Sequence, residues 1–76
     1  MALRRLRMLS AAGDESLAEW DTETLSPQRL QEIESEFNEK MRQGFFAVDI
    51  TEGRNQLIRK FDPNAEMLLI PAVRGG

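Results

Sequence analysis

The sequence of 76 residues has no cysteine, no histidine and no tyrosine. Without cysteine there is no disulfide, no thiolate nucleophile and no cysteine zinc site, and without histidine the commonest general base and metal ligand is missing. A domain of this size also buries only about 60% of the surface that its unfolded chain exposes, which leaves little room for an active-site cavity. The sequence therefore predicts no metal, no cofactor and no catalytic site.

Excess basic charge and long apolar runs are also missing. Ten basic residues against thirteen acidic ones give a net charge of −3, which argues against nucleic acid as the main partner. The longest apolar run, residues 67–73, contains Pro71 and is far shorter than the roughly 20 residues that cross a bilayer, so we expect no membrane partner. Residues 1–12 are arginine-rich and free of acid, as in a transit peptide, but so small a fold needs them for closure. We expect a cytoplasmic protein, and the lack of cysteine fits a reducing cytosol.

The spacing of apolar residues predicts one helix over residues 27–43. Ser26 is a good N-cap, Pro27 suits the first helical position, and Gly44 ends the helix. Apolar side chains recur every three or four positions and form one stripe, consisting of Leu30, Ile33, Phe37 and Met41. The other face is charged, and we interpret it as solvated.

A period of two replaces the helical period after Gly44 and predicts strands over residues 45–50, 56–61 and 67–70. Residues 3–11 and 15–21 are predicted to form a hairpin, although Leu3, Leu6 and Leu9 would also fit a short helix closed by Gly13. The hairpin register that separates charged from apolar pairs matches Arg5 with Asp21, Arg7 with Glu19, Leu6 with Trp20 and Met8 with Ala18.

These elements predict an α+β fold, a ββαβββ mixed sheet with one helix packed on one face and the last strand parallel to the first. We expect a domain over residues 1–71 and a flexible tail over residues 72–76. The predicted core contains part of residues 67–70 together with Leu6, Met8, Trp20, Leu30, Ile33, Phe37, Met41, Val48, Ile50 and Phe61.

The last residues of the sequence bear on function rather than on fold. Two glycines at the last two positions arise by chance in roughly 0.5% of chains, since glycine is about 7% of average composition. A flexible end or a cloning remnant would also explain them. An adenylating enzyme, however, must thread such a tail through a narrow channel, and a side chain on Gly75 or Gly76 would obstruct that path.

The element order, the length and the ending Arg74-Gly75-Gly76 resemble ubiquitin and the ubiquitin-like modifiers of the β-grasp fold. The segment Leu69-Ile70-Pro71-Ala72-Val73-Arg74-Gly75-Gly76 is also similar to the end of the small subunit of molybdopterin synthase. The resemblance implies a substrate and carrier rather than an enzyme. It implies that an E1-like adenylating enzyme recognises Ala72, Val73 and Arg74 and activates Gly76 for isopeptide bond formation with a target protein.

Two alternatives remain open beside this modifier. A sulfur carrier would receive sulfur from a sulfurtransferase and end in a thiocarboxylate at Gly76, and Ala72-Val73 is closer to that type. A structural or assembly module would not be conjugated at all. The carboxylates Asp14, Glu15, Glu19, Asp21 and Glu23 lie close in sequence, but on a surface hairpin opposite arginines they give no sign of acid–base catalysis.

The hairpin register also predicts a partner surface. Leu9 and Leu17 would pair on the sheet face away from the helix, beside one alternate pair of the last strand, either Leu68 with Ile70 or Met67 with Leu69. Exposed apolar patches of a few hundred Å² tend to be interaction sites, whereas scattered surface leucines need no explanation.

Overall fold

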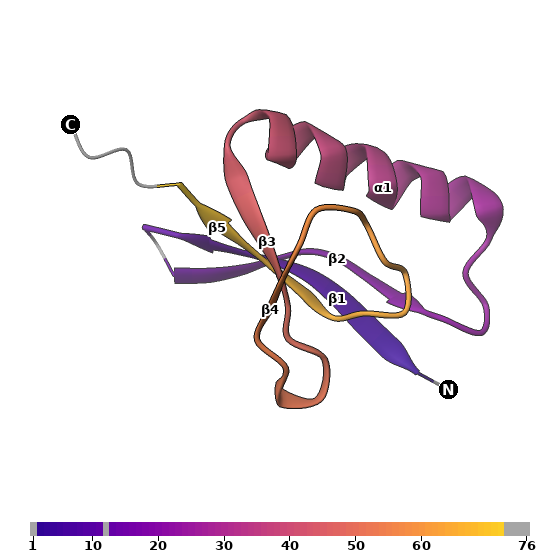
Figure 1. Cartoon of the computed structure of the whole chain (residues 1–76). Coiled ribbons are helices and arrows are strands. Elements are labelled where there is room, and N and C mark those ends of the chain that lie inside the picture. Colours follow the sequence, from indigo (N-terminus) through magenta and orange to yellow (C-terminus); the bar gives the residue numbers. More distant parts are fainter. Residues whose placement is uncertain (1, 12, 73–76) are drawn as a thin grey trace.

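The computed structural model describes residues 2–11 and 13–72, which form one helix and a five-stranded sheet (Figure 1). The elements follow the order β1 (Leu3–Ser10), β2 (Gly13–Asp21), α1 (Pro27–Arg42), β3 (Phe45–Asp49), the 3₁₀ helix η1 (Thr51–Gly53), β4 (Gln56–Ile58) and β5 (Met67–Pro71). The strands lie in the order β2-β1-β5-β3-β4, and α1 crosses one face of the sheet. The predicted α+β class, with one helix on a mixed sheet, is confirmed.

Local signals place α1 where the sequence predicted it. The Ser26 hydroxyl accepts a hydrogen bond from the backbone N–H of Arg29 at 3.1 Å, and Pro27 is the first helical residue. The helix ends at Arg42, and Gly44 takes a φ of +99° that a side chain would disfavour. Ile33 and Phe37 are fully buried and hold the apolar stripe against the sheet.

The first two strands form the predicted hairpin, but in another register. Leu6 lies opposite Ala18 instead of Trp20, a shift of two residues, and the alternation of faces survives because two is the period of a strand. Between Leu6 and Arg7 the pairing shifts again by one residue at a β-bulge. The prediction placed the loop over residues 12–14 and assumed a continuous ladder, whereas Ser10 lies opposite Gly13 and β2 contains an extra residue.

The face assignment of β3 was wrong. Ala47 and Asp49 are buried, whereas Val48, predicted to lie in the core, is only half-buried on the opposite face. The reason is the pairing with β5, which sets Ala47 opposite Leu69. Both rows of β3 are largely apolar, so only the neighbouring strand decides which row faces the helix.

The last part of the β4 segment also differs from the prediction. β4 ends at Ile58, and Phe61 leaves the sheet. Its ring centroid lies 5.6 Å from that of Phe37 and 5.7 Å from that of Trp20. Such separations are favourable for aromatic pairs, so Phe61 closes the core from the loop instead of from a strand.

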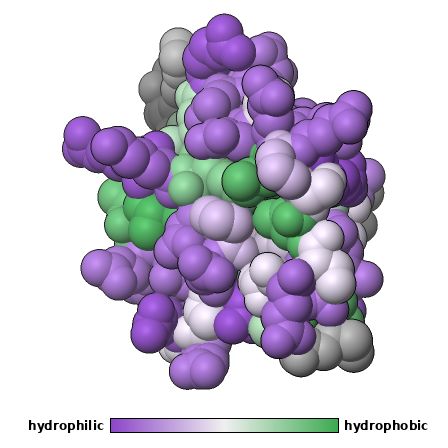
Figure 2. All heavy atoms as spheres, turned by 90° about the vertical axis from the view of Figure 1, so that its right-hand side faces the viewer, coloured by the Kyte–Doolittle hydropathy of each residue, from purple (hydrophilic) through white to green (hydrophobic). Residues whose placement is uncertain are grey.

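The core lies between α1 and the sheet. Its buried apolar residues are Leu6, Ala18, Trp20, Ile33, Phe37, Ala47, Ala65, Met67 and Leu69. On the side seen in Figure 2, hydrophilic atoms cover the top and bottom of the molecule, and hydrophobic atoms surface in a band at mid-height. Within the part of the chain that the structure describes, no helix has the length and apolar character of a membrane span.

The predicted core was right in its centre and wrong at its margins. Leu30 and Ile50, which were predicted to be buried, are only partly buried, as is Met8. Ala18 and Ala65 take part in their place. Small side chains let backbones approach closely, and apolar periodicity alone gives them little weight.

Candidate functional site

The predicted reactive tail follows β5. Pro71, the last residue of that strand, lies opposite Phe45, and Ala72 is partly buried without regular secondary structure. The tail residues Val73, Arg74, Gly75 and Gly76 lie outside the described residues. Of the predicted recognition segment, the structure therefore describes Ala72 alone.

Leu68 and Ile70 of β5, which were predicted to belong to the partner surface, lie on the sheet face away from α1. Met67 and Leu69 are fully buried, so the alternation of the strand directs Leu68 and Ile70 to the other face. Leu68 lies opposite Val48, and Ile70 lies opposite Phe46. Of the two alternate pairs that the sequence left open, Leu68 and Ile70 are therefore the pair on this face.

An apolar surface extends from β5 across β3 to β4. In the register of these strands Leu57 of β4 lies opposite Val48. Leu57 is 62% exposed and Phe46 is 50% exposed. The residues that share this face are Phe46, Val48, Leu57, Leu68 and Ile70, and we refer to them as the outer patch. Contiguous exposed apolar surface of this kind tends to mark an interaction site.

The hairpin contributes to this face differently from the prediction. Leu9 lies opposite Asp14 and is 42% exposed, on the same face as Ile70 because the preceding residue, Met8, pairs with Leu69. Leu17 is the extra residue of the β-bulge and packs against the core cluster. The predicted pair of Leu9 with Leu17 was therefore wrong, and Leu17 is no part of the outer patch.

Over β1 and β2 the same face is charged. Arg5 Nε donates a hydrogen bond to Glu19 Oε2 at 2.7 Å, and Arg7 pairs with Asp14. The hydrogen bond to Glu19 raises the pKa of the Arg5 guanidinium. The Arg5–Glu19 pair is exposed and the Arg7–Asp14 pair is partly exposed, as expected for a solvated surface of the hairpin.

A buried carboxylate, which the sequence analysis missed, lies at the end of β3. Asp49 Oδ1 accepts hydrogen bonds from the backbone N–H of Thr51 at 2.9 Å and from its hydroxyl at 2.6 Å. These bonds, with help from the charge of Arg54, lower the pKa of Asp49. The Thr51 hydroxyl oxygen in turn accepts from the backbone N–H of Glu66 at 2.8 Å.

The Asp49 network is structural in character. It joins the end of β3 to the residue before β5, and the Asp-x-Thr spacing of such turns was the signal that could have revealed it. An ionised carboxylate with these partners has no proton to give near neutral pH. Among residues 2–11 and 13–72, no group of three or more acidic residues could hold a metal ion.

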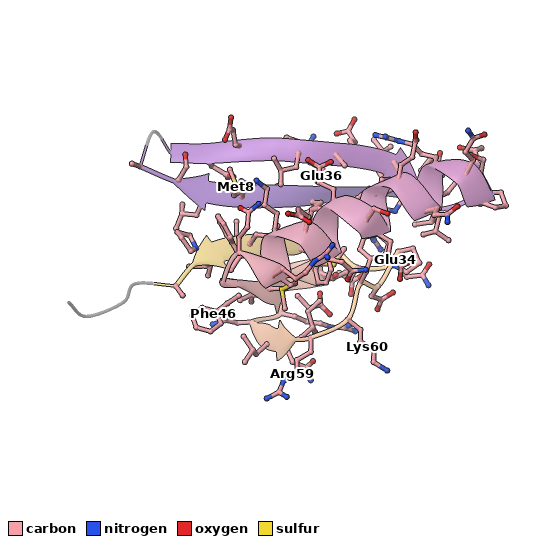
Figure 3. The ribbon with its side chains drawn as sticks, turned by 90° about the horizontal axis from the view of Figure 1, so that it is seen from above. Met8, Glu34, Glu36, Phe46, Arg59 and Lys60 are labelled. Carbon is pink, nitrogen blue, oxygen red and sulfur yellow. The ribbon has the colours of Figure 1, made fainter. Side chains whose placement is uncertain are left out.

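A cavity of about 280 Å³ opens at the β4 edge of the sheet. It lies where β4 ends opposite Ala47, so that the start of β3 continues without a neighbour on that side. Its lining comes from the end of α1, from β3, from β4 and from the residue after β4, and consists of Met41, Phe46, Ala47, Leu57, Ile58 and Arg59. We refer to this cavity as the edge pocket. Two of these lining residues, Phe46 and Arg59, are labelled in Figure 3.

Comparisons with known proteins give no family for the chain. No protein-family model matches the sequence, and no match was found among curated proteins or solved structures. The candidate sites therefore depend on the geometry described above.

Proposed function

We propose that this chain is a ubiquitin-like protein of the β-grasp class, which modifies target proteins through the carboxylate of Gly76. The observation that supports the proposal is the position of β5. This strand lies in the middle of the sheet, parallel to β1 and antiparallel to β3, and it ends at Pro71. Among the described residues the buried apolar core reaches no further along the chain than Leu69, so the fold does not use residues 70–72 as core.

The chemistry takes place at the last residue, and the activating enzyme supplies the catalytic groups. A carboxylate oxygen of Gly76 attacks the α-phosphate of ATP, and pyrophosphate leaves. An enzyme thiolate then attacks the Gly76 carbonyl, and AMP leaves as the thioester forms. A lysine amine of the target finally displaces the thiol and forms the isopeptide bond. Glycine leaves both faces of this carbonyl uncrowded.

The chain itself would be a substrate and carrier in these steps. Arg74, Val73 and Ala72 would guide the tail into the enzyme, and the outer patch would contact the enzyme or the target. Apolar side chains exposed on a rigid sheet give such a contact surface little entropy to lose. Leu68 and Ile70, close to the end of β5, connect this surface to the tail.

A sulfur carrier is the second candidate, and the composition of the tail favours it. The segment from Leu69 to Val73 is apolar throughout and contains Pro71, as in the carrier type described above. In that case the persulfide of a sulfurtransferase would attack the carbonyl of the adenylated Gly76 and AMP would leave, and a thiol would then reduce the resulting acyl disulfide and release the thiocarboxylate.

Intact-mass spectrometry of the chain isolated from its native cell tests the proposal. We expect a fraction joined to another protein, and incubation with the activating enzyme, ATP and magnesium should give a thiol-sensitive adduct. A mass gain equal to the exchange of one oxygen for sulfur would instead identify the sulfur carrier. Finding only unmodified protein, together with no phenotype for deletion of Gly75 and Gly76, would favour the structural module.

Two variants make this test specific. Deletion of Gly75 and Gly76 should abolish the adduct and leave the melting temperature unchanged, because the described core lies before these residues. Gly76→Ala should react at an intermediate rate, since the added methyl crowds the carbonyl but leaves a carboxylate to adenylate.

A further inference from the structure

We propose that the edge pocket, together with Arg59 and Lys60, binds an extended peptide in which an apolar side chain lies close in sequence to acidic residues. The apolar side chain would enter the pocket, and the carboxylates would pair with the two cations. This inference does not depend on chemistry at Gly76.

The first argument is the open strand edge. β4 is the outermost strand on its side of the sheet and has only three residues, Gln56–Ile58. One side of β4 therefore has no strand neighbour among the described residues, and the first two residues of β3, which pair with β5 on their other side, have no neighbour on the side of β4. Unpaired backbone groups at a sheet edge accept an added strand, so an extended peptide fits this edge.

The second argument is the shape and chemistry of the pocket. Its volume of about 280 Å³ is slightly below the range of about 300–1,000 Å³ of small-molecule sites, which suits a side chain rather than a whole cofactor. Five of its six lining residues are apolar. Leu57 and Phe46 are among the most exposed large apolar residues that the structure describes, and a peptide side chain would cover them.

The third argument is charge complementarity. Most arginines in the described part of the chain have a carboxylate partner, namely Arg5, Arg7, Arg29, Arg42 and Arg54. Arg4 donates to the carbonyl of Asn64, and Lys40 lies over the ring of Phe45. Arg59 and Lys60 are exposed and form no ion pair with any described residue. In Figure 3 both side chains extend outward from the β4 side of the sheet.

The position of the two cations limits the distance along the peptide between its apolar and acidic residues. Arg59 lines the pocket and directly follows the last residue of β4, and Lys60 comes next. A carboxylate that reaches Arg59 must therefore be close in sequence to the side chain in the pocket. A second copy of this chain fits less well, because each copy carries a net charge of −3 and its Asp14 and Glu19 already pair with arginines.

The test uses the full chain and a fluorescent peptide with the sequence Ser-Leu-Phe-Val-Asp-Glu-Asp-Ser. Fluorescence anisotropy should show saturable binding that weakens with salt, as expected for exposed charge pairs. A peptide with lysines in place of its acids should bind at least about tenfold more weakly, because charged hydrogen bonds are lost. Equal binding of the two peptides, or no binding of the acidic one, would overturn the proposal.

Matched variants locate the site. Arg59→Glu should weaken binding by about tenfold or more, whereas Arg29→Glu, the same charge change on the exposed surface of α1, should leave it unchanged. The chain that lacks Gly75 and Gly76 should bind like the full chain, which separates this site from the proposed function. Backbone amide NMR shifts should cluster at β4 and the start of β3. Shifts confined to Leu68 and Ile70, or self-association of the chain as the only binding seen, would contradict the edge site.

Discussion

Replacing Phe37 by alanine measures how much of the stability depends on the contact between α1 and the sheet. Phe37 is fully buried on the inner side of the helix, and its ring meets that of Phe61 edge-on. The substitution removes the ring, leaves a cavity in the centre of the core and deprives Phe61 of one of its two aromatic neighbours. The surrounding residues relax only partly into such a space.

The expected loss is about 3–5 kcal/mol, the usual cost of a buried phenylalanine-to-alanine change. A domain of this length has about 4–11 kcal/mol in total, at roughly 0.05–0.15 kcal/mol per residue. The variant should therefore melt at least about 12 °C lower, since each kcal/mol shifts the melting temperature of so small a domain by roughly 4–8 °C. At the lower end of this stability range the variant is largely unfolded at room temperature, so the urea midpoint should be measured in the cold as well.

Trp20 provides the assay because it is the one tryptophan in the sequence and it is buried. Its indole N–H donates to the carbonyl of Pro63 at 2.8 Å, so its fluorescence reports the same core. The control is Glu36→Ala on the exposed face of α1, which should change the free energy of unfolding by less than about 0.5 kcal/mol. A Phe37→Ala variant that melts within two or so degrees of the control would refute this account of the core.

Three further predictions concern single contacts. Asp49→Asn should destabilise the protein at pH 7. Because folding lowers the pKa of Asp49, the difference in unfolding free energy between this variant and the wild type should shrink as the pH falls below about 4. Urea titrations at pH 7 and pH 3 measure this difference at each pH. Ser26→Ala removes the helix cap and should cost about 0.5–2 kcal/mol in the same assay. Arg5→Ala breaks an exposed pair with Glu19 and should leave the melting temperature unchanged within error, so a clear fall would show that the pair is more than a surface contact.

The parts of the fold that the sequence predicts well are those with local signals. Ser26, Pro27 and Gly44 define α1 because caps and glycine turns act within a few residues. The hairpin pairing was wrong because the turn lies elsewhere: the prediction left residues 12–14 as the loop, whereas Ser10 lies opposite Gly13, and the bulge then shifts the register by one residue. The inner face of β3 was wrong for a related reason, because contact with β5 determines it.

The candidate sites also contain parts that local sequence patterns predict and parts that depend on contacts between distant segments. Alternation in β5 limited the pair on the outer face to two choices, and the half-buried Leu68 and Ile70 are that pair. The edge pocket could not be predicted, since it exists only because the chain leaves the sheet after Ile58. The aromatic contacts that draw Phe61 into the core come from α1 and β2, which lie far away in the sequence.

The central position of β5 affects how the protein folds while it is being synthesised. β5 is the only strand that links the β1–β2 pair to the β3–β4 pair in the described sheet, and it carries two of the fully buried core side chains, Met67 and Leu69. On a ribosome that adds roughly 5–20 residues per second, the finished first hairpin waits about 2–9 s for its partner strand. During that interval the edges of β1 and β3 are unpaired, so nascent chains are most exposed to aggregation or to chaperones immediately before synthesis of β5 is complete.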